Sequence, residues 1–343
     1  MANPPLPLVA LTMGDPAGIG PEICLKAMHD AQLLSRVRIL VVGDTEPLQQ
    51  AAEQTGLAIP GSTITIDELP DVDLQALVPS VAFLDCAVCL DPVVMGRPSR
   101  IAGEASCFYI ETATRLALDG RVDAICTGPI TKTTLKLAEV DEPGHTEILA
   151  RLCERDDYAM LLYSPRLAVS FVTCHQSLAS VPGALTARRI RDVAHLMTSA
   201  LMTIRGKQPR LGILGLNPHA GEEGLFGDEE IEIIAPAVEQ CRADGLDVEG
   251  PIPPDAAFMP RALERLDGHV TMYHDQGGIP FKMVSLHDGV NVTMGLPIIR
   301  TSVDHGTAYD IAGMNCAEHS SLRAALLLAA QLASRRVGAA ASR

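Results

Sequence analysis

The sequence predicts an α/β fold divided into two domains, and three observations support this prediction. Short apolar, β-branched runs alternate along the chain with longer segments in which apolar residues recur at helical spacing, as in parallel α/β proteins. The length of 343 residues is too great for one small domain. The composition is 47% hydrophobic but only 3% aromatic, so we expect a large and mainly aliphatic core.

The amino-terminal part of the chain opens with a strand, a glycine-rich loop and a helix. Leu8 to Met13 predicts the strand, residues 14–20 predict the loop, and Pro21 suits the first turn of the helix. The loop lacks the ending of a P-loop and the spacing of the dinucleotide fingerprint, so by itself it indicates only a tight turn. The next expected elements are strands over 37–42 and 122–126 and a helix over 103–118 that Gly120 stops.

The carboxyl-terminal half continues the alternation. A helix is expected over 186–204, because apolar residues recur there every three or four positions. Another helix begins near Asp228, and Pro236 inside it predicts a kink or an earlier stop. The remaining expected elements are a strand over 290–293, a loop over 299–313 and a final helix over 320–335.

Three strand-like runs end on a histidine, at His175, His219 and His274. In an open α/β sheet, ligands bind outside the carboxyl ends of the strands, so three imidazoles there could converge on one divalent metal such as Zn²⁺ or Co²⁺. The alternative is that each is a hydrogen-bonded structural residue, since the long spacings form no local metal motif. Asp275 could orient a ligand or act as a base, or it could simply form a turn before residues 276–278.

Five polar residues form two candidate groups for binding an anion. His145 and Thr146 lie at a predicted helix start, where backbone N–H groups favour anions, and an N-cap by Thr146 is the alternative. Lys282, Asn291 and Arg300 follow in a region rich in glycine. Lys282 has apolar neighbours and either extends along the surface or is held for a negative ligand. The planar guanidinium of Arg300 fits carboxylate or phosphate.

Charge and cysteine content argue against several classes of protein. A net charge of −15 opposes non-specific binding of nucleic acid. The nine cysteines show no disulfide spacing, and we expect Cys86 and Cys89 to be buried thiols in a strand. Residues 1–7 show no signal-peptide pattern, and the apolar stretch 324–333 is too short to span a bilayer. We therefore expect a cytoplasmic protein without nucleic-acid or membrane partners.

Five motifs resemble, in order, those of the 4-hydroxythreonine-4-phosphate dehydrogenase family. They are MGDPAGIGPE at 13–22, GHTE at 144–147, NPHAGE at 217–222, YHDQG at 273–277 and IRTSVDHGTA at 299–308. The resemblance extends over nearly the whole chain, from about Leu8 to Ala333. Residues 14–22 and 305–313 also resemble loops of the isocitrate and isopropylmalate dehydrogenases.

The resemblance implies a two-domain α/β/α fold like that of the isocitrate and isopropylmalate dehydrogenases. It implies an active-site cleft between the domains and at the interface of a homodimer, with ligands drawn from both subunits. The expected domains are a discontinuous cofactor-side domain, residues 1–128 plus 295–343, and a domain for metal, substrate and dimerisation, residues 129–294.

The resemblance also assigns roles to individual residues. It implies metal ligands at His175, His219 and His274. It implies substrate contacts at His145, Thr146, Lys282, Asn291 and Arg300. It implies cofactor contacts at His305, Gly306, Asp310 and Gly313. Asp275 and Lys282 are the candidates for the catalytic base. The implied cofactors are a divalent metal (Zn, Co or Mg) and NAD or NADP.

The implied activity is oxidation of 4-phosphooxy-L-threonine at its secondary alcohol. The product, 2-amino-3-oxo-4-phosphooxybutanoate, would decarboxylate to 3-amino-2-oxopropyl phosphate, a step in pyridoxal phosphate biosynthesis. One alternative is oxidation of 4-phospho-D-threonate or 4-phospho-D-erythronate in sugar-acid catabolism. A remoter alternative is a non-catalytic protein that binds metal or phosphate.

Overall fold

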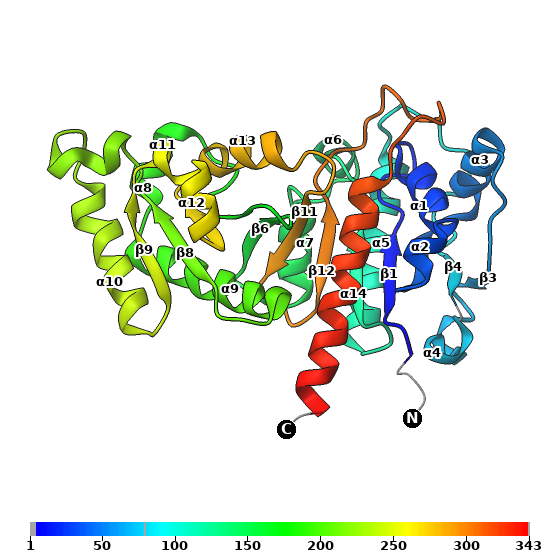
Figure 1. Ribbon diagram of the computed structural model, residues 1–343. Coiled ribbons are helices and arrows are strands. Elements are labelled where there is room, and N and C mark those ends of the chain that lie inside the picture. The colour runs from blue at the N-terminus through cyan, green and yellow to red at the C-terminus, as the bar shows by residue number, and fades with distance from the viewer. Residues whose placement is uncertain (1–4, 79, 342–343) are drawn as a thin grey trace. The chain divides into compact units, whose positions relative to one another are not determined.

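The computed structural model describes residues 5–78 and 80–341, and the chain divides into two compact units (Figure 1). Unit 1 comprises Met1–Asp156 and Leu296–Arg343, and unit 2 comprises Asp157–Gly295. The chain therefore leaves unit 1 and returns to it. Residues 132–152 belong to unit 1, because the helices there pack on the long helix over 100–118. The functional roles of the two domains stay predictions.

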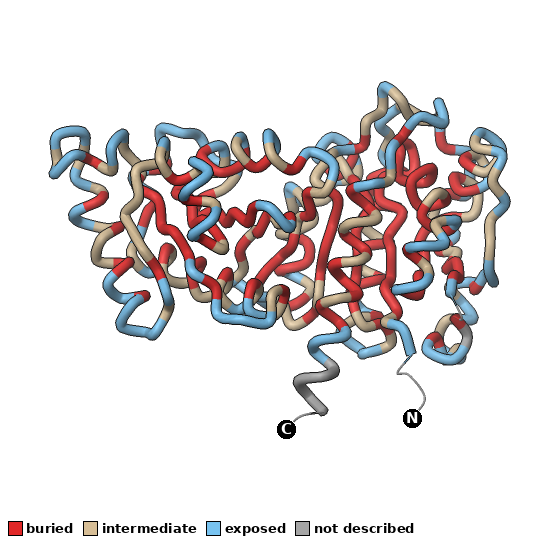
Figure 2. The backbone as a smooth tube through the Cα atoms, in the orientation of Figure 1, coloured by how far each residue is buried: buried red, intermediate tan, exposed pale blue. Residues whose placement is uncertain are grey.

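Unit 1 contains a parallel sheet with the strand order β3-β4-β2-β1-β5-β12. Its strands are β1 (Leu8–Thr12), β2 (Arg38–Gly43), β3 (Ser62–Thr65), β4 (Val81–Asp85), β5 (Ala124–Thr127) and β12 (Arg300–Val303). The strands β1, β2 and β5 are buried along their whole length (Figure 2), as expected for parallel strands covered on both faces. Cys86 and Cys89 are buried free thiols, as predicted, but they follow β4 and do not lie within a strand.

Helices cover the sheet of unit 1. They are α1 (Gly20–Met28), α2 (Ala31–Leu34), α3 (Thr45–Thr55), α4 (Leu74–Leu77), α5 (Arg100–Leu118), α6 (Lys132–Leu137), α7 (His145–Leu152) and α14 (Ser320–Ala341), with a short 3₁₀ turn at Leu69–Asp71. α5 begins before the expected residue 103, because the hydroxyl of Ser99 accepts a hydrogen bond from the backbone N–H of Ala102 and caps the helix.

The sheet of unit 2 has the order β11-β6-β7-β10-β8-β9. Its strands are β6 (Ala159–Tyr163), β7 (Ala168–Phe171), β8 (Arg210–Leu214), β9 (Asp247–Ile252), β10 (Gly268–Thr271) and β11 (Val290–Met294). β6 runs antiparallel to both of its neighbours, which corrects the expectation of a parallel sheet here. The cause is the short turn between β6 and β7, since a parallel crossover needs a dozen or more residues.

The helices of unit 2 connect these strands. They are α8 (Val181–Ala184), α9 (Ala187–Arg205), α10 (Ala235–Ala243), α11 (Pro254–Ala257), α12 (Pro260–Arg265) and α13 (His274–Val284), with 3₁₀ turns at Leu178–Ser180 and Pro218–Gly224. α9 confirms the predicted helix, and the hydroxyl of Thr186 caps it. The predicted kink near Pro236 is a π-helical turn, Glu230–Ile234, directly before α10. Proline has no N–H to continue the α-helical bonds there.

α13 was not expected from the sequence, which reads as a turn at 276–278. Two glycines and Pro280 lie inside this helix and disfavour it locally. The packing explains Gly277, because a Cβ atom there would lie 2.2 Å from Cγ1 of Val169 in β7. The glycine therefore lets the helix approach the sheet closely.

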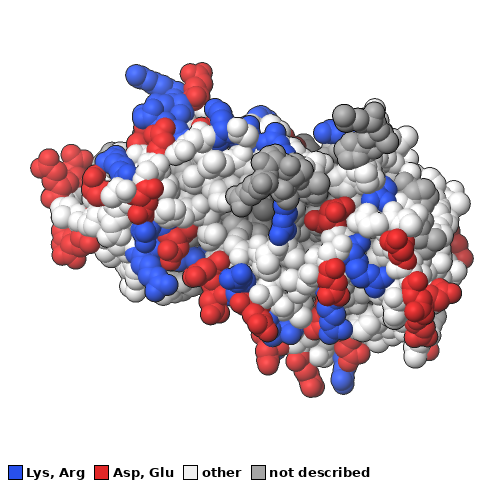
Figure 3. Space-filling view, turned by 90° about the horizontal axis from the view of Figure 1, so that it is seen from below, with Lys and Arg blue, Asp and Glu red and all other residues white. Residues whose placement is uncertain are grey.

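No helix among the described residues is long and apolar enough to cross a membrane. Acidic and basic side chains are interspersed on the face shown in Figure 3.

Candidate active site

The three predicted metal ligands follow three parallel strands of unit 2, but none lies within a strand. His175 follows β7, which ends at Phe171, and has a positive φ of 48°. His274 follows β10 and is the first residue of α13. His219 follows β8 and lies in the turn Pro218–Gly224, with a φ of 55°. Loops and a helix start, not the strands themselves, therefore aim these rings.

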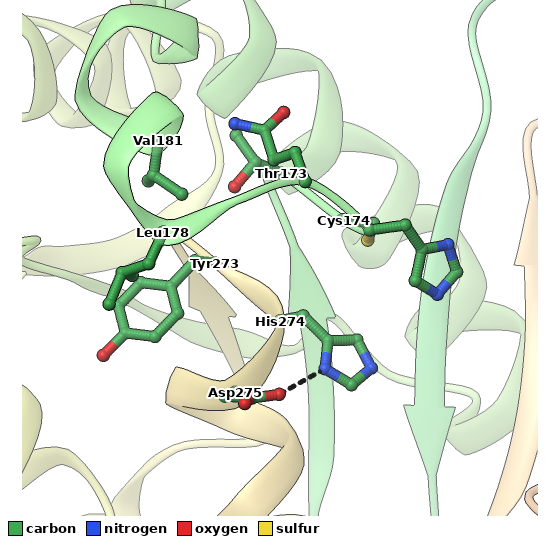
Figure 4. Close-up of a pocket in the computed structure, with 9 residues that line it drawn as sticks. Thr173, Cys174, Leu178, Val181, Tyr273, His274 and Asp275 are labelled. Carbon is green, nitrogen blue, oxygen red and sulfur yellow. Dashed lines mark hydrogen bonds and ion pairs between the residues drawn. The ribbon is translucent and has the colours of Figure 1, made fainter.

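His175 and His274 lie side by side, because β7 and β10 are neighbouring parallel strands. Their ring centroids are 5.8 Å apart and the ring planes are tilted by 35°. Both rings line a cavity of about 450 Å³, part of which is drawn in Figure 4. The cavity is also lined by Thr173, Cys174, Gln176, Leu178, Val181, Tyr273 and Asp275.

Two contacts fix the ring of His274. It stacks on Phe171 with a centroid distance of 5.1 Å, and its Nδ1 lies 2.7 Å from Oδ1 of Asp275 (Figure 4). A carboxylate can only accept a hydrogen bond, so in the neutral ring the contact places the proton on Nδ1 and leaves the lone pair on Nε2. Nε2 is therefore the ring nitrogen suited to a metal, with Asp275 in the place of an orienting carboxylate.

His219 does not join the other two rings in the same chain. Among residues 5–78 and 80–341, no three His, Cys, Asp or Glu side chains are grouped so that they could hold a metal ion. The ring of His219 lies 6.2 Å from that of Phe226 instead. One chain therefore brings together two of the three predicted imidazoles.

The other predicted substrate residues of unit 2 are Lys282 and Asn291. Lys282 is exposed on α13. Asn291 lies in β11, where its Nδ2 is 3.3 Å from Sδ of Met160. Its Oδ1 is buried without a hydrogen-bond partner in the described structure, so this amide has capacity for a ligand.

In unit 1, Arg300 is a buried cation at the start of β12. Its side chain is 2% exposed, and its Nη2 donates a hydrogen bond to Oγ1 of Thr127 in β5 at 2.8 Å. Burial lowers the pKa of this guanidinium from 12.5 to about 10, while Cys126 and Glu147 act in the opposite direction. The group is still charged at neutral pH, so it favours an anion beside it.

His145 is the electrostatic neighbour of Arg300 and the first residue of α7. Burial, and then the positive charge of Arg300, lower the pKa of its imidazole well below the ordinary value of 6.5. Its Nε2 is buried without a hydrogen-bond partner in the described structure. Thr146 follows in the first turn, and the N-cap is Gly144, so the predicted alternative of a Thr146 cap is wrong. The helix start and the nearby buried cation are the two features here that favour an anion.

The predicted cofactor residues lie in the loop between β12 and α14. Nδ1 of His305 is 3.0 Å from the carbonyl oxygen of Gly306, and its Nε2 is buried without a partner in the described structure. Gly306 has open space where a Cβ would lie, and Asp310 is exposed. Gly313 has a φ of +80° and lies against the side chain of Gln54.

A buried carboxylate, which the sequence did not single out, anchors this loop. Asp15 lies in the glycine-rich loop after β1 and is fully buried. Its Oδ2 accepts hydrogen bonds from Oη of Tyr309 at 2.6 Å and Oγ1 of Thr134 at 3.0 Å. Burial raises the pKa of this carboxyl, and the hydrogen bonds oppose that shift. The two loops that resemble those of the isocitrate dehydrogenases are thus joined inside unit 1.

The chain is similar to a family model, to curated proteins and to solved structures over nearly its whole length. Residues 35–329 match the family model described as pyridoxal phosphate biosynthetic protein PdxA. A 4-hydroxythreonine-4-phosphate dehydrogenase of Desulforapulum autotrophicum is 44% identical over 94% of this chain and 95% of its own. A D-threonate 4-phosphate dehydrogenase of Salmonella typhimurium is 41% identical over 95% and 98%. The solved structure of a 4-hydroxythreonine-4-phosphate dehydrogenase from Klebsiella pneumoniae is 41% identical, with a TM-score of 0.83 over 97% of this chain and 99% of its own.

Proposed function

This chain belongs to the PdxA family and is an oxidoreductase, and from this premise we propose that it oxidises 4-phosphooxy-L-threonine. The secondary alcohol becomes a ketone, with its hydride passing to NAD⁺ or NADP⁺ and its hydroxyl proton to a base. The resulting β-keto acid loses CO₂ to give 3-amino-2-oxopropyl phosphate. Relatives with the corresponding name share 41–45% identity with nearly the full chain.

The observation that carries this proposal is the buried anion site of unit 1. The Arg300 guanidinium is 2% exposed, and its positive charge favours an anionic group of a ligand beside it. The helix start at His145 adds backbone N–H groups and the positive end of a helix dipole. We propose that Arg300, His145 and Thr146 hold an anionic group of the substrate, with Lys282 and Asn291 as further contacts.

The donor atoms in unit 2 fit a divalent metal. We propose His175, His219 and His274 as its ligands, and neutral imidazoles suit Zn²⁺ or Co²⁺ better than Mg²⁺. A bound metal supplies positive charge that makes a hydroxyl easier to deprotonate, and a bound nicotinamide supplies the hydride acceptor. Asp275 holds the ring of His274 with Nε2 available, through the 2.7 Å contact to Nδ1.

The base is proposed to be Asp275 or Lys282. Asp275 is engaged with His274 in this structure, although its side chain is 71% exposed and keeps acceptor capacity. Lys282 is exposed on the same helix. We propose that the loop containing His305, Gly306, Asp310 and Gly313 binds the cofactor.

A homodimer is proposed as the active form. The three imidazoles do not meet in one chain, so a partner would supply the missing one. Large apolar side chains are exposed around the metal-ligand segments, which favours burial against a second copy. They include Leu225, Phe226, Ile279, Met283 and Leu286. The cleft between the domains and a cytoplasmic location also remain predictions.

A second candidate function is oxidation of 4-phospho-D-threonate. It is favoured by relatives named D-threonate 4-phosphate dehydrogenase, which share 40–41% identity over 95% of this chain. 4-Phospho-D-threonate has a hydroxyl group where 4-phosphooxy-L-threonine has an amine. Both substrates carry a phosphate and a carboxylate, which are the groups that the anion site would bind.

Formation of reduced nicotinamide, followed by absorbance, tests the proposal. Each of the two substrates is supplied with NAD⁺ or NADP⁺, with Zn²⁺ or Co²⁺ and after removal of metal by a chelator. We expect metal-dependent turnover with 4-phosphooxy-L-threonine. Turnover of 4-phospho-D-threonate alone would establish the second candidate. No reduction under any condition would overturn both and favour a binding protein without catalysis.

A further inference from the structure

The segment that carries His219 has an unusual backbone. Residues 219–223 all have positive φ values, from 44° to 83°, so they form a left-handed turn. Only Gly221 among them is a glycine. For the other residues the Cβ atom crowds the following carbonyl oxygen, so a run of this kind persists only where its surroundings hold it.

The carboxylate of Glu230 holds the start of this segment. Glu230 is 3% exposed and begins the π-helical turn before α10. Its Oε1 accepts hydrogen bonds from the backbone N–H groups of Leu216 at 2.6 Å and Asn217 at 2.8 Å. Its Oε2 accepts one from Nδ2 of Asn217 at 2.9 Å. Three donors therefore converge on one buried carboxylate directly before the left-handed turn.

The left-handed turn packs tightly on this carboxylate. A Cβ atom at Gly221 would lie 2.8 Å from Oε2 of Glu230, and one at Gly215 would lie 2.9 Å from Oε1. The N–H of Phe226 closes the turn from the other end by donating to the carbonyl oxygen of Gly221 at 3.1 Å. Movement of the Glu230 carboxylate would therefore change the backbone packing at Gly215 and Gly221 and disturb the left-handed turn.

Gln276 links the same segment to the strand that leads to His274. Its Nε2 donates to the carbonyl oxygen of Gly215 at 2.7 Å, and its Oε1 accepts from the N–H of Met272 at 2.7 Å. The side chain is 8% exposed. The segments before His219 and before His274 are thus held against each other by one buried amide.

We propose that Glu230 is a positioning residue for the metal site, which acts by holding the left-handed turn so that His219 is presented as a ligand. This inference rests on the proposed role of His219 in binding metal. The carboxylate supplies acceptors for backbone donors that no strand or helix satisfies, and it makes the strained turn the favoured conformation. Outer groups that orient metal ligands typically contribute about 10–100-fold to affinity.

The first test is the affinity of the metal-free full-length protein for Co²⁺, measured by calorimetric titration. We expect Glu230→Gln to bind Co²⁺ at least about tenfold more weakly than the wild type, because the amide keeps one acceptor oxygen and sets its NH₂ group against a donor. Glu232→Gln is the matched control, since Glu232 is an exposed glutamate two residues further along, and it should bind Co²⁺ as the wild type does. Wild-type affinity in Glu230→Gln would overturn the proposal.

The second test is hydrogen exchange of the backbone amides of Leu216, Asn217 and Phe226. They should exchange faster in Glu230→Gln than in Glu232→Gln, while amides of β8 keep their protection. Unchanged exchange would overturn the proposal whatever the metal affinity. Added Ala220→Gly should restore part of the lost affinity, because glycine adopts the left-handed conformation freely.

His219→Ala separates this inference from the proposed function. If His219→Ala binds Co²⁺ like the wild type, the proposed ligand set fails, and the positioning role fails with it. If His219→Ala loses affinity and Glu230→Gln does not, only the positioning role fails. If both lose affinity and exchange quickens in Glu230→Gln, the positioning role stands.

Discussion

Replacing Arg300 with methionine should make the ligand-free protein more stable while removing its affinity for anions. Methionine has a similar length, carries no charge and fills irregular space in a core. The guanidinium that it replaces is 2% exposed and has a pKa lowered by burial from 12.5 to about 10. A base whose pKa is lower in the folded state destabilises that state at every pH below the folded pKa. The penalty is therefore fully present at neutral pH.

The magnitude follows from these two pKa values. The difference between 12.5 and about 10 corresponds to about 3 kcal/mol of unfavourable ionisation in the folded protein. The substitution also removes the hydrogen bonds of the guanidinium, among them the 2.8 Å bond to Thr127, and each lost bond offsets about 1 kcal/mol of this gain. We therefore expect Arg300→Met to be more stable by up to about 2 kcal/mol, in line with neutral replacements of buried charges.

Thermal unfolding of the ligand-free protein, at one fixed protein concentration, measures this difference. The midpoint should rise by up to roughly 8 °C in Arg300→Met. Inorganic phosphate should raise the midpoint of the wild type and leave that of Arg300→Met unchanged. Arg300→Lys is the control, since it keeps the buried charge and should not be stabilised. A less stable Arg300→Met, or one that phosphate still stabilises, would refute the reasoning.

Three further predictions concern pH, helix packing and assembly. Burial lowers the pKa of His269 from 6.5 to about 4, so the residue has no effect on stability above pH 6.5. As pH falls from 6.5 to 4 the unfolded state alone binds the proton, and the fold loses about 3 kcal/mol of stability. Unfolding by urea across this range should show a weaker pH dependence in His269→Gln, and an unchanged dependence would contradict this. Gly277→Ala should destabilise unit 2 by about 1–3 kcal/mol and weaken Co²⁺ binding, because its Cβ would lie 2.2 Å from Val169. Gly183→Ala, where a Cβ meets nothing within 4 Å, is the control, and equal stability of the two variants in a urea titration would count against the packing argument. Met283→Asp, at a side chain that is 82% exposed, should yield monomers with weakened Co²⁺ affinity in sedimentation and calorimetry. Met202→Asp on α9 should stay dimeric, and a dimeric Met283→Asp would exclude α13 from the interface.

Local patterns in the sequence were enough for the elements whose stability is local. The helix expected over 186–204 is α9, because its apolar spacing and the Thr186 cap act within a few residues. The strands β1, β2 and β5 are apolar runs that are buried on both faces, so their composition identifies them. The expected loop over 299–313 is wrong at its start, where Arg300–Val303 form β12 by pairing with β5. The kink near Pro236 likewise follows from the missing N–H of one residue.

The sequence also identified the chemistry of the candidate site, but not how its parts are held. It singled out His175, His219 and His274 as possible ligands. The structure shows that loops and the start of α13 carry these rings, and that one chain brings together His175 and His274. The motifs contain Asp15 and Gln276 but do not show their roles, and Glu230 lies outside them, because each role depends on partners that the fold brings close.

By itself, the sequence determined the α/β class, the local elements and the residue types available for binding metal and anions, since these depend on composition and short-range periodicity. Only the tertiary structure decided the antiparallel β6, the close packing that makes α13 a helix despite its glycines, and the left-handed turn at His219. It also decided the burial of Arg300, whose altered pKa comes from exclusion of water. Each of these depends on contacts between segments far apart along the chain, which no local pattern encodes.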